Sequence, residues 1–370
     1  MKRTTRIYVN VQATVALCAT VACTHSNEPA RIDDDRHISF EVETNSFSQT
    51  SRAEGITTTE NIPEFKIWAY DTALFAFVMQ GVTAVRTGIN SWSYSPAADW
   101  TGNPINFTAV SPASVDININ PWWVDMIRYQ NKGDQDLVVC RRTNVVQTSG
   151  RLKLHFYHAL AMVDVVVRPN LPDGKVVLKS VTMVNVNDVG EFHYPPEGFN
   201  AATTAAEVSE CWNIYPQSLR IPVFFSENGT ALPNASAFAA DNQGYDFFIP
   251  SYLTEFNFDA YFNTTYLEID YRLENDHGAT IWPNASTDYR LVSDNNPGYG
   301  QLRLGLSTGL EEHRWLAGKR YRYNVAINGP AEVPPGAASD NAPSAATSLT
   351  LDIADSFTDI SHPSDPNHPL

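Results

Sequence analysis

Residues 152–167 read LKLHFYHALAMVDVVV, and this stretch decides the fold of the chain. Its regularly placed apolar side chains recur at every second position, which is the period of a β-strand. In the first half they stand at even-numbered positions, whereas from Ala161 onward they stand at odd-numbered positions. Such a change of face within one apolar run predicts a β-bulge or bend at Ala159-Leu160.

Short segments with the same alternation follow one another along the chain, and no long segment has a helical period. Turn-forming Pro and Gly residues punctuate them. Many short strands spaced by turns predict an all-β fold built from antiparallel β-sandwiches. The predicted strands cover residues 38–42, 65–70, 74–79, 105–111, 115–119, 136–142, 176–186, 245–250, 266–273, 301–306, 321–327 and 348–353.

The length of 370 residues is enough for two domains, each with its own core. The strand pattern restarts at Gly150, which we take as the boundary between them. We therefore predict an N-terminal β-sandwich domain over residues 37–149 and a C-terminal one over residues 150–330. Residues 331–370 then comprise a linker rich in Pro and Ala, a terminal strand over residues 348–353, and a polar tail.

The N-terminal segment has the features of a bacterial export signal. A basic start is followed by a mostly apolar stretch over residues 7–22, which ends in Thr20-Val21-Ala22-Cys23. Small residues before a cysteine resemble the lipobox of lipoproteins, so we predict a signal peptide over residues 1–22 and lipidation of Cys23. The acidic residues 23–36 would then form a tether. The alternative is an ordinary secretory signal with an incidental cysteine.

The charge of the chain limits the partners it can have. Lys and Arg total 25 against 41 Asp and Glu, which gives a formal net charge of −16. Nucleic acids are poor partners for such a chain, because phosphate binding depends on basic side chains. No later segment is long and apolar enough to span a membrane, so we expect attachment through lipid.

Two cysteines remain once the signal peptide and Cys23 are set aside. Cys140 and Cys211 could form one disulfide in an oxidising compartment or stay buried as free thiols. We favour two buried thiols, because domains of this size do not need a covalent crosslink.

An ordered series of motifs resembles the fimbrillin-like proteins of the Bacteroidetes, which include the Mfa-like lipoproteins and fimbrial subunits. The matching elements are the lipobox Cys23, ISFEV (38–42), Ser51-Arg52-Ala53, FKIWAYD (65–71), WSYSP (92–96) with Trp100, INFTAVSP (105–112), HALAMVDVVV (158–167) and WLAGKRYRYNVAING (315–329). The resemblance implies two tandem transthyretin-like (Ig-like) β-sandwich domains. It also implies a subunit of a fimbrium at the cell surface and outer membrane, with other fimbrial subunits as partners and a role in adhesion or biofilm formation. Stalk, anchor and tip subunits share these features.

The resemblance further implies a route of assembly. An Arg-specific protease would cut at Arg52, so that the processed chain begins at Ala53 and loses its first strand. A sheet edge exposed in this way can accept a strand from the next subunit. Leu349, Leu351 and Ile353 on the terminal strand are the candidate donor residues. The alternatives are that this strand completes its own sandwich and that Arg52 is only a loop residue.

The sequence contains no constellation that predicts catalysis, a cofactor or a metal site. His155 and His158 are three residues apart, which places them on opposite faces of a strand. Carboxylates such as Asp270, Glu311 and Glu312 are common in an acidic chain and give no signal for acid–base chemistry. Phosphate-binding loops and nucleophile elbows are also absent. We predict a protein that is not an enzyme.

A second hypothesis is a surface lipoprotein that binds host or bacterial glycans through exposed aromatic rings. The candidate platforms are Trp92, Tyr94, Trp100 and the pair Trp122-Trp123. For these side chains we favour packing, since large aromatic residues dominate protein cores.

Overall fold

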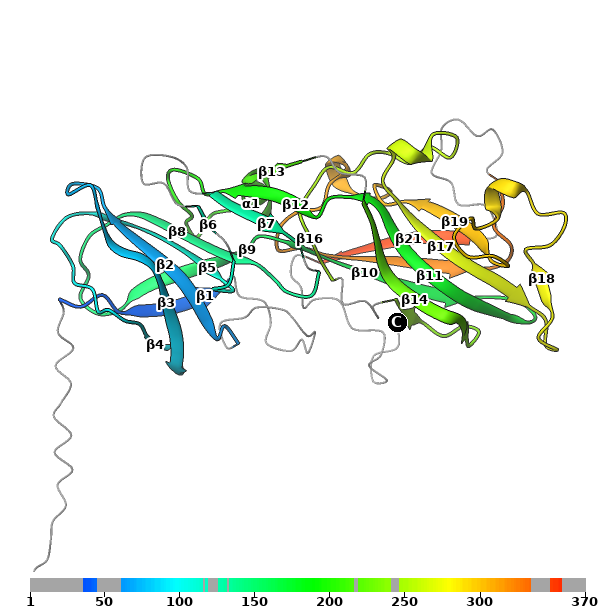
Figure 1. Ribbon diagram of the computed structural model, residues 1–370, viewed down its shortest axis with the longest axis horizontal. Helices are drawn as coiled ribbons and strands as arrows, with labels where there is room; N and C mark the ends of the chain where they lie inside the picture. Colours follow the sequence, from blue (N-terminus) through cyan, green and yellow to red (C-terminus); the bar gives the residue numbers. More distant parts are fainter. Residues whose placement is uncertain are drawn as a thin grey trace, which may run out of the picture. The chain divides into compact units, whose positions relative to one another are not determined.

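The computed structural model describes residues 36–44, 61–115, 117–118, 126–131, 133–215, 219–240, 246–333 and 347–354 (Figure 1). Its regular secondary structure is almost entirely β-strand, which confirms the predicted all-β class. The helical elements are α1 (Ala205–Glu210), η1 (Tyr261–Asn263), η2 (Tyr289–Leu291) and η3 (Glu311–His313). None of these helices is long and apolar enough to cross a membrane.

A seven-stranded sheet holds most of the strands that precede Gly150, in the order β1-β9-β8-β5-β2-β3-β4. Its strands are β1 (Phe40–Thr44), β2 (Glu64–Asp71), β3 (Ala76–Gly88), β4 (Ser91–Ser93), β5 (Ile105–Ser111), β8 (Val138–Val145) and β9 (Leu152–His158). Neighbouring strands are antiparallel except β1, which runs parallel to β9. Alternate side chains of these strands enclose one apolar core.

Two further sheets share a second apolar core. One has the order β15-β10-β20-β21, with β16 also on β10; the other has the order β14-β11-β17-β18, with β19 also on β17. Their strands are β10 (Ala161–Pro169), β11 (Lys175–Val186), β14 (Leu219–Leu232), β15 (Phe238–Ala239), β16 (Phe247–Phe248), β17 (Tyr266–Glu274), β18 (Thr280–Trp282), β19 (Gly300–Gly305), β20 (Arg320–Ile327) and β21 (Thr347–Ala354). All these pairs are antiparallel except β10 with β20.

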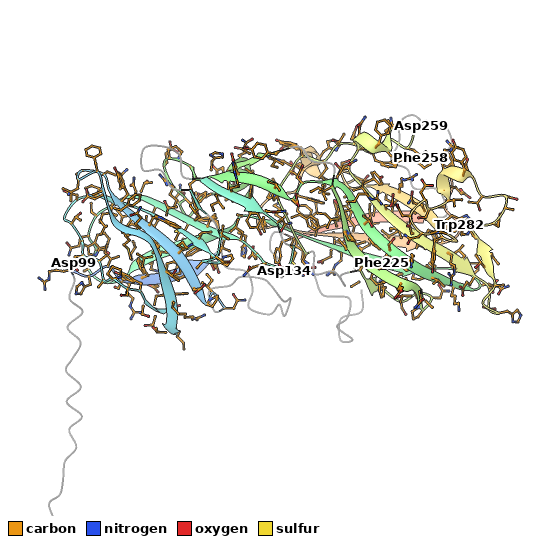
Figure 2. The ribbon with its side chains drawn as sticks, viewed as in Figure 1. Asp99, Asp134, Phe225, Phe258, Asp259 and Trp282 are labelled. Atoms are coloured by element: carbon orange, nitrogen blue, oxygen red, sulfur yellow. The ribbon has the colours of Figure 1, made fainter. Side chains whose placement is uncertain are left out.

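Trp282 shows how closely this second core is packed. Its side chain, labelled in Figure 2, is 4% exposed, and its ring centroid lies 4.7 Å from that of Tyr271. The Trp282 ring also lies against the backbone of Gly300. Only glycine fits there, because a Cβ atom at that position would lie 2.0 Å from a ring carbon of Trp282. A side chain there would therefore force the tryptophan out of place.

A small four-stranded sheet joins segments from before and after Gly150. Its order is β13-β12-β7-β6, with strands β6 (Ile117–Asn118), β7 (Met126–Gln130), β12 (Val189–His193) and β13 (Trp212–Ile214). A third apolar cluster, which includes Trp68, Phe192 and Trp212, likewise combines residues from both parts. The division into domains at residues 149 and 150 remains a prediction.

The structure has a bend at Leu160, which confirms the bend predicted within residues 152–167. No bulge lies within one continuous strand. The chain leaves the seven-stranded sheet after His158, and from Ala161 it forms the strand β10 of another sheet. The side chains of β9 and β10 therefore fill different cores, which inverts the phase of the pattern.

Candidate functional site

The terminal strand β21 is the last strand in the order β15-β10-β20-β21, where it pairs antiparallel with β20. The register runs from Thr347 opposite Ile327 to Ala354 opposite Arg320. Residues 328–346 connect the two strands. Ordinary hairpin connections have about two to five residues, so a tight turn does not hold β21 to its neighbour.

The three candidate donor residues share one face of β21. Leu349 and Leu351 are partly buried and pack against the core between the two sheets, whereas Ile353 is 45% exposed. They stand opposite the inward-facing residues of β20, with Leu351 across from Tyr323. In this structure the terminal strand covers its own sandwich, and its use as a donor strand remains a prediction.

The first described strand, β1, lies at an edge of the seven-stranded sheet. Ile38, Phe40 and Val42 are each at most 2% exposed, and the ring of Phe40 meets that of Phe65 at a centroid distance of 5.8 Å. Loss of this strand would uncover both the apolar face beneath it and the backbone edge of β9.

Five residues of the sequence predictions lie outside the described residues. They are Cys23, Arg52, Ala53, Trp122 and Trp123. Lipidation, proteolytic processing and a glycan-binding role for these tryptophans therefore stay predictions.

The other aromatic candidates take part in packing. Trp100 is 9% exposed and contacts Phe107 at a centroid distance of 5.8 Å, while Trp92 is partly buried 4.8 Å from Phe65. The Tyr94 hydroxyl donates a hydrogen bond to the backbone oxygen of Ile38. This confirms packing for these three side chains and leaves Trp100 without the exposed face that a sugar ring requires.

His155 and His158 have different surroundings. His158 is buried, with its Nδ1 atom 2.7 Å from Oδ2 of the fully buried Asp136. The half-exposed His155 has Nδ1 3.8 Å from a carboxylate oxygen of Glu43. The histidines therefore contact two different carboxylates and do not share a site.

Cys140 and Cys211 are both free thiols. Cys140 is buried as predicted, but the expectation of a second buried thiol is wrong in part, because Cys211 at the end of α1 is only half-buried. Burial raises the pKa of each thiol to about 12. Both therefore stay protonated near neutral pH and are poor nucleophiles.

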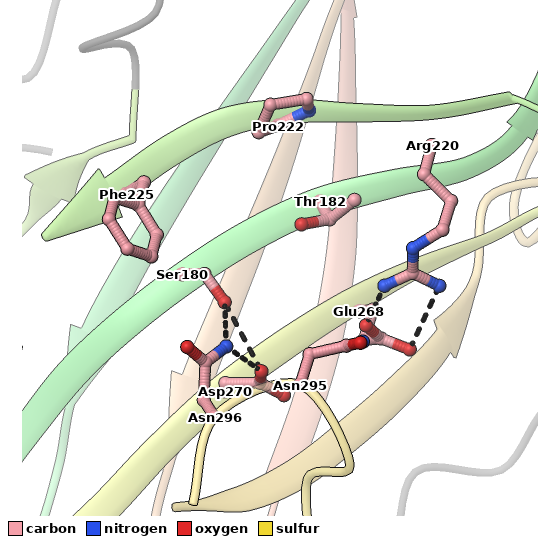
Figure 3. A pocket seen from close by; sticks show the side chains of 9 residues that line it. All are labelled: Ser180, Thr182, Arg220, Pro222, Phe225, Glu268, Asp270, Asn295 and Asn296. Carbon is pink, nitrogen blue, oxygen red and sulfur yellow. Dashed lines mark hydrogen bonds and ion pairs between the residues drawn. The ribbon is translucent and has the colours of Figure 1, made fainter. Parts of the chain in front are cut away.

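A cavity of about 460 Å³ lies on the outer face of β14, β11 and β17, and no pattern in the sequence indicates it (Figure 3). Its floor includes Asp270, which carried no signal in the sequence. Carboxylates occur throughout an acidic chain, and the other lining residues are distant in sequence. Strand pairing alone brings them together.

Comparisons with known proteins found the following similarities. A family model described as Fimbrillin-like matches residues 51–341. Among curated proteins none matches the chain. A structure of a candidate cell adhesion protein from Bacteroides ovatus aligns with a TM-score of 0.49 at 12% identity, over 88% of this chain and 99% of that one. A fimbrilin from Porphyromonas gingivalis aligns with a TM-score of 0.42 at 10% identity, over 86% of this chain and 97% of that one.

Proposed function

The chain belongs to the fimbrillin-like family, and we propose on this premise that it is a structural subunit of a cell-surface fimbrium. Its partners would be other subunits of the same fimbrium, and its role would be adhesion or biofilm formation rather than catalysis. A lipid on Cys23 would attach the exported chain to the outer membrane until assembly.

The observation that carries the proposal is the likeness of two edge strands. Phe40 and Val42 on the first strand, together with Ile38 just before it, form one apolar set, and Leu349, Leu351 and Ile353 on the terminal strand form the other. Each set has three apolar side chains at two-residue spacing. The terminal strand can therefore fill the groove that β1 occupies, because side chains on one face of a strand repeat every second residue.

Proteolysis at Arg52 would allow the terminal strand of one subunit to replace β1 of another. Cleavage at Arg52 would break the covalent link between β1 and the rest of the fold. The segment would then be held only by non-covalent contacts, with β9, with the core and with residues 94–100. Once β1 leaves, the terminal strand of a second subunit can pair with the vacant edge of β9 and place its three apolar side chains on the exposed core. This is β-strand addition.

The proposal is tested by treating the purified, signal-free full chain with an Arg-specific protease. We expect N-terminal sequencing to find Ala53, and negative-stain microscopy to show filaments in the cleaved sample alone. The variant Arg52→Ala should stay monomeric under the same treatment.

A second variant separates cleavage from assembly. Leu349→Asp combined with Leu351→Asp should still be cut at Arg52 but should form no filaments, since two charges would enter an apolar groove. Matched changes on the opposite face, Ser348→Asp and Thr350→Asp, should leave assembly intact. Filaments from the Leu349 and Leu351 variant would contradict the donor role of the terminal strand.

A further inference from the structure

The cavity of about 460 Å³ is formed by outward-facing side chains of one sheet together with Asn295 and Asn296 from the loop before β19. Ser180 and Thr182 on β11 stand directly opposite Asp270 and Glu268 on β17. The residues between them, such as Ile269, point the other way into the apolar core. The same alternation that builds the core therefore lines this cavity with polar groups. Its volume lies within the roughly 300–1,000 Å³ of known small-molecule sites.

The two carboxylates that line the cavity, Glu268 and Asp270, have partners of different charge. Glu268 forms an ion pair with the Arg220 guanidinium, and Arg303 Nε lies 3.8 Å from its other side. Asp270 is 1% exposed, and its partners in the described structure are all neutral. Its oxygens accept hydrogen bonds from the four side chains of Ser180, Ser293, Asn296 and Gln301, at 3.3, 2.7, 2.5 and 3.1 Å.

This network orients the wall of the cavity. The Asn296 amide nitrogen is held between Asp270 and Ser180, and Figure 3 shows its amide oxygen turned away from Asp270. Asn295 and Thr182 add a second amide and a hydroxyl to the lining. A ligand in the cavity therefore meets hydrogen-bond donors and acceptors that are already positioned, which reduces the entropy lost on binding.

An aromatic ring stands at one end of the cavity. Phe225 on β14, labelled in Figures 2 and 3, lines the cavity and is 44% exposed. Lys179 Nζ lies 4.7 Å from its ring centroid. A partly exposed ring beside buried polar groups suits a ligand with one apolar face and several hydroxyl groups.

We propose that this cavity binds a neutral saccharide, with its hydroxyl groups bonded to the amides, hydroxyls and guanidinium of the lining and one sugar face packed on Phe225. Sugar hydroxyls both donate and accept, as this mixed lining requires. Two carboxylic side chains line the cavity against one arginine, which disfavours anionic ligands. Within the described residues no three His, Cys, Asp or Glu side chains are placed to hold a metal ion. The site lies on β11, β14 and β17, so it does not depend on strand exchange.

Saturation-transfer NMR on the signal-free full chain tests the proposal. The probes are neutral mono- and disaccharides, namely the methyl glycosides of glucose, galactose, mannose and N-acetylglucosamine together with lactose and N,N′-diacetylchitobiose. Glucuronate and glucosamine serve as the anionic and cationic counterparts. We expect transfer to at least one neutral sugar and none to the charged ones.

Two variants locate the binding site, with calorimetry on the best neutral sugar as the measurement. Phe225→Ala should raise the Kd about tenfold. Thr182→Val keeps the shape of the side chain and should weaken binding several-fold by removing one hydroxyl. The matched control is Phe75→Ala, which removes a ring that is 63% exposed in the β2–β3 turn and should leave the Kd unchanged.

Three results would overturn the proposal. The first is no transfer to any neutral sugar from a chain whose circular dichroism shows it folded. The second is transfer to the charged sugars alone. The third is binding that the folded Phe225→Ala variant retains in full.

Discussion

Leu351 on the terminal strand stands opposite Tyr323 on β20, and the two differ sharply in burial. Tyr323 is fully buried, and its hydroxyl donates a hydrogen bond to the backbone oxygen of Leu306. Leu351 packs against the same core but is only partly buried. The terminal strand thus packs on the outside of the core, whereas the side chains of β20 are buried within it.

The first prediction concerns how much the packing of Leu351 contributes to the stability of the folded chain. Leu351→Asp should lower the free energy of unfolding by about 1–3 kcal/mol, because it places a charge against apolar surface. Urea denaturation of the uncleaved chain measures this. Ser348→Asp, on the exposed face of the same strand, should change stability by less than about 0.5 kcal/mol. Equal effects of the two variants would contradict the contact of Leu351 with the core.

A second prediction concerns a charge cluster on β10 and β20. Asp164 Oδ2 lies 2.6 Å from Arg320 Nη2 and 3.1 Å from Arg322 Nη2, and both arginine side chains are at most 3% exposed. Asp164→Asn should cost about 3 kcal/mol, since it removes the carboxylate they share. The comparison variant Asp352→Asn removes an exposed carboxylate that stands opposite Arg322 and is bonded to Asn324, so it should cost less than Asp164→Asn. A loss below about 1 kcal/mol for Asp164→Asn would show that other partners neutralise the arginines.

The third prediction is a dependence on acid. Burial alone would raise the pKa of Asp71, but hydrogen bonds from Thr101, Leu74, Asn103 and Ala73 lower it from 3.8 to about 2. A carboxyl with a lowered folded pKa stabilises the protein above its unfolded pKa, and this contribution is lost as the pH falls. The wild type should therefore lose stability between pH 4 and pH 2 more steeply than Asp71→Asn. Parallel curves for the two proteins, from thermal unfolding across this range, would contradict the assignment.

The fourth prediction concerns the thiols. Because burial raises the pKa of Cys140 and Cys211 to about 12, little thiolate forms in mildly alkaline buffer. Ellman's reagent should modify the half-buried Cys211 slowly and the buried Cys140 only on unfolding. The variants Cys140→Ser and Cys211→Ser assign the two phases. Fast reaction of Cys140 in the folded chain would contradict its burial, because the reagent could then reach the thiol without unfolding.

Alternating apolar residues predicted the strands and much of the core. Residues 266–273 illustrate this, since their inward set of Leu267, Ile269, Tyr271 and Leu273 is buried as the pattern indicates. Periodicity is a local property that follows from the pleat of the strand, so sequence alone reveals it.

Strand partners could not be predicted in the same way. The parallel pairing of β1 with β9 joins segments more than a hundred residues apart, and no local pattern records it. The cavity beside Asp270 depends equally on such pairing. Serine, asparagine and aspartate on β11, on β17 and in the loop at Asn296 become neighbours only after the sheet forms.

The small sheet of β7 and β12 has a mechanical consequence for a fibre subunit. Five residue pairs, from Val189 opposite Gln130 to His193 opposite Met126, join segments on either side of Gly150. A force that separates the segments before and after Gly150 must therefore break the backbone hydrogen bonds between β7 and β12. It must also disrupt the aromatic cluster around Phe192. Straightening a single connecting peptide would not be enough. Such a joint would resist separation of the two parts under tension.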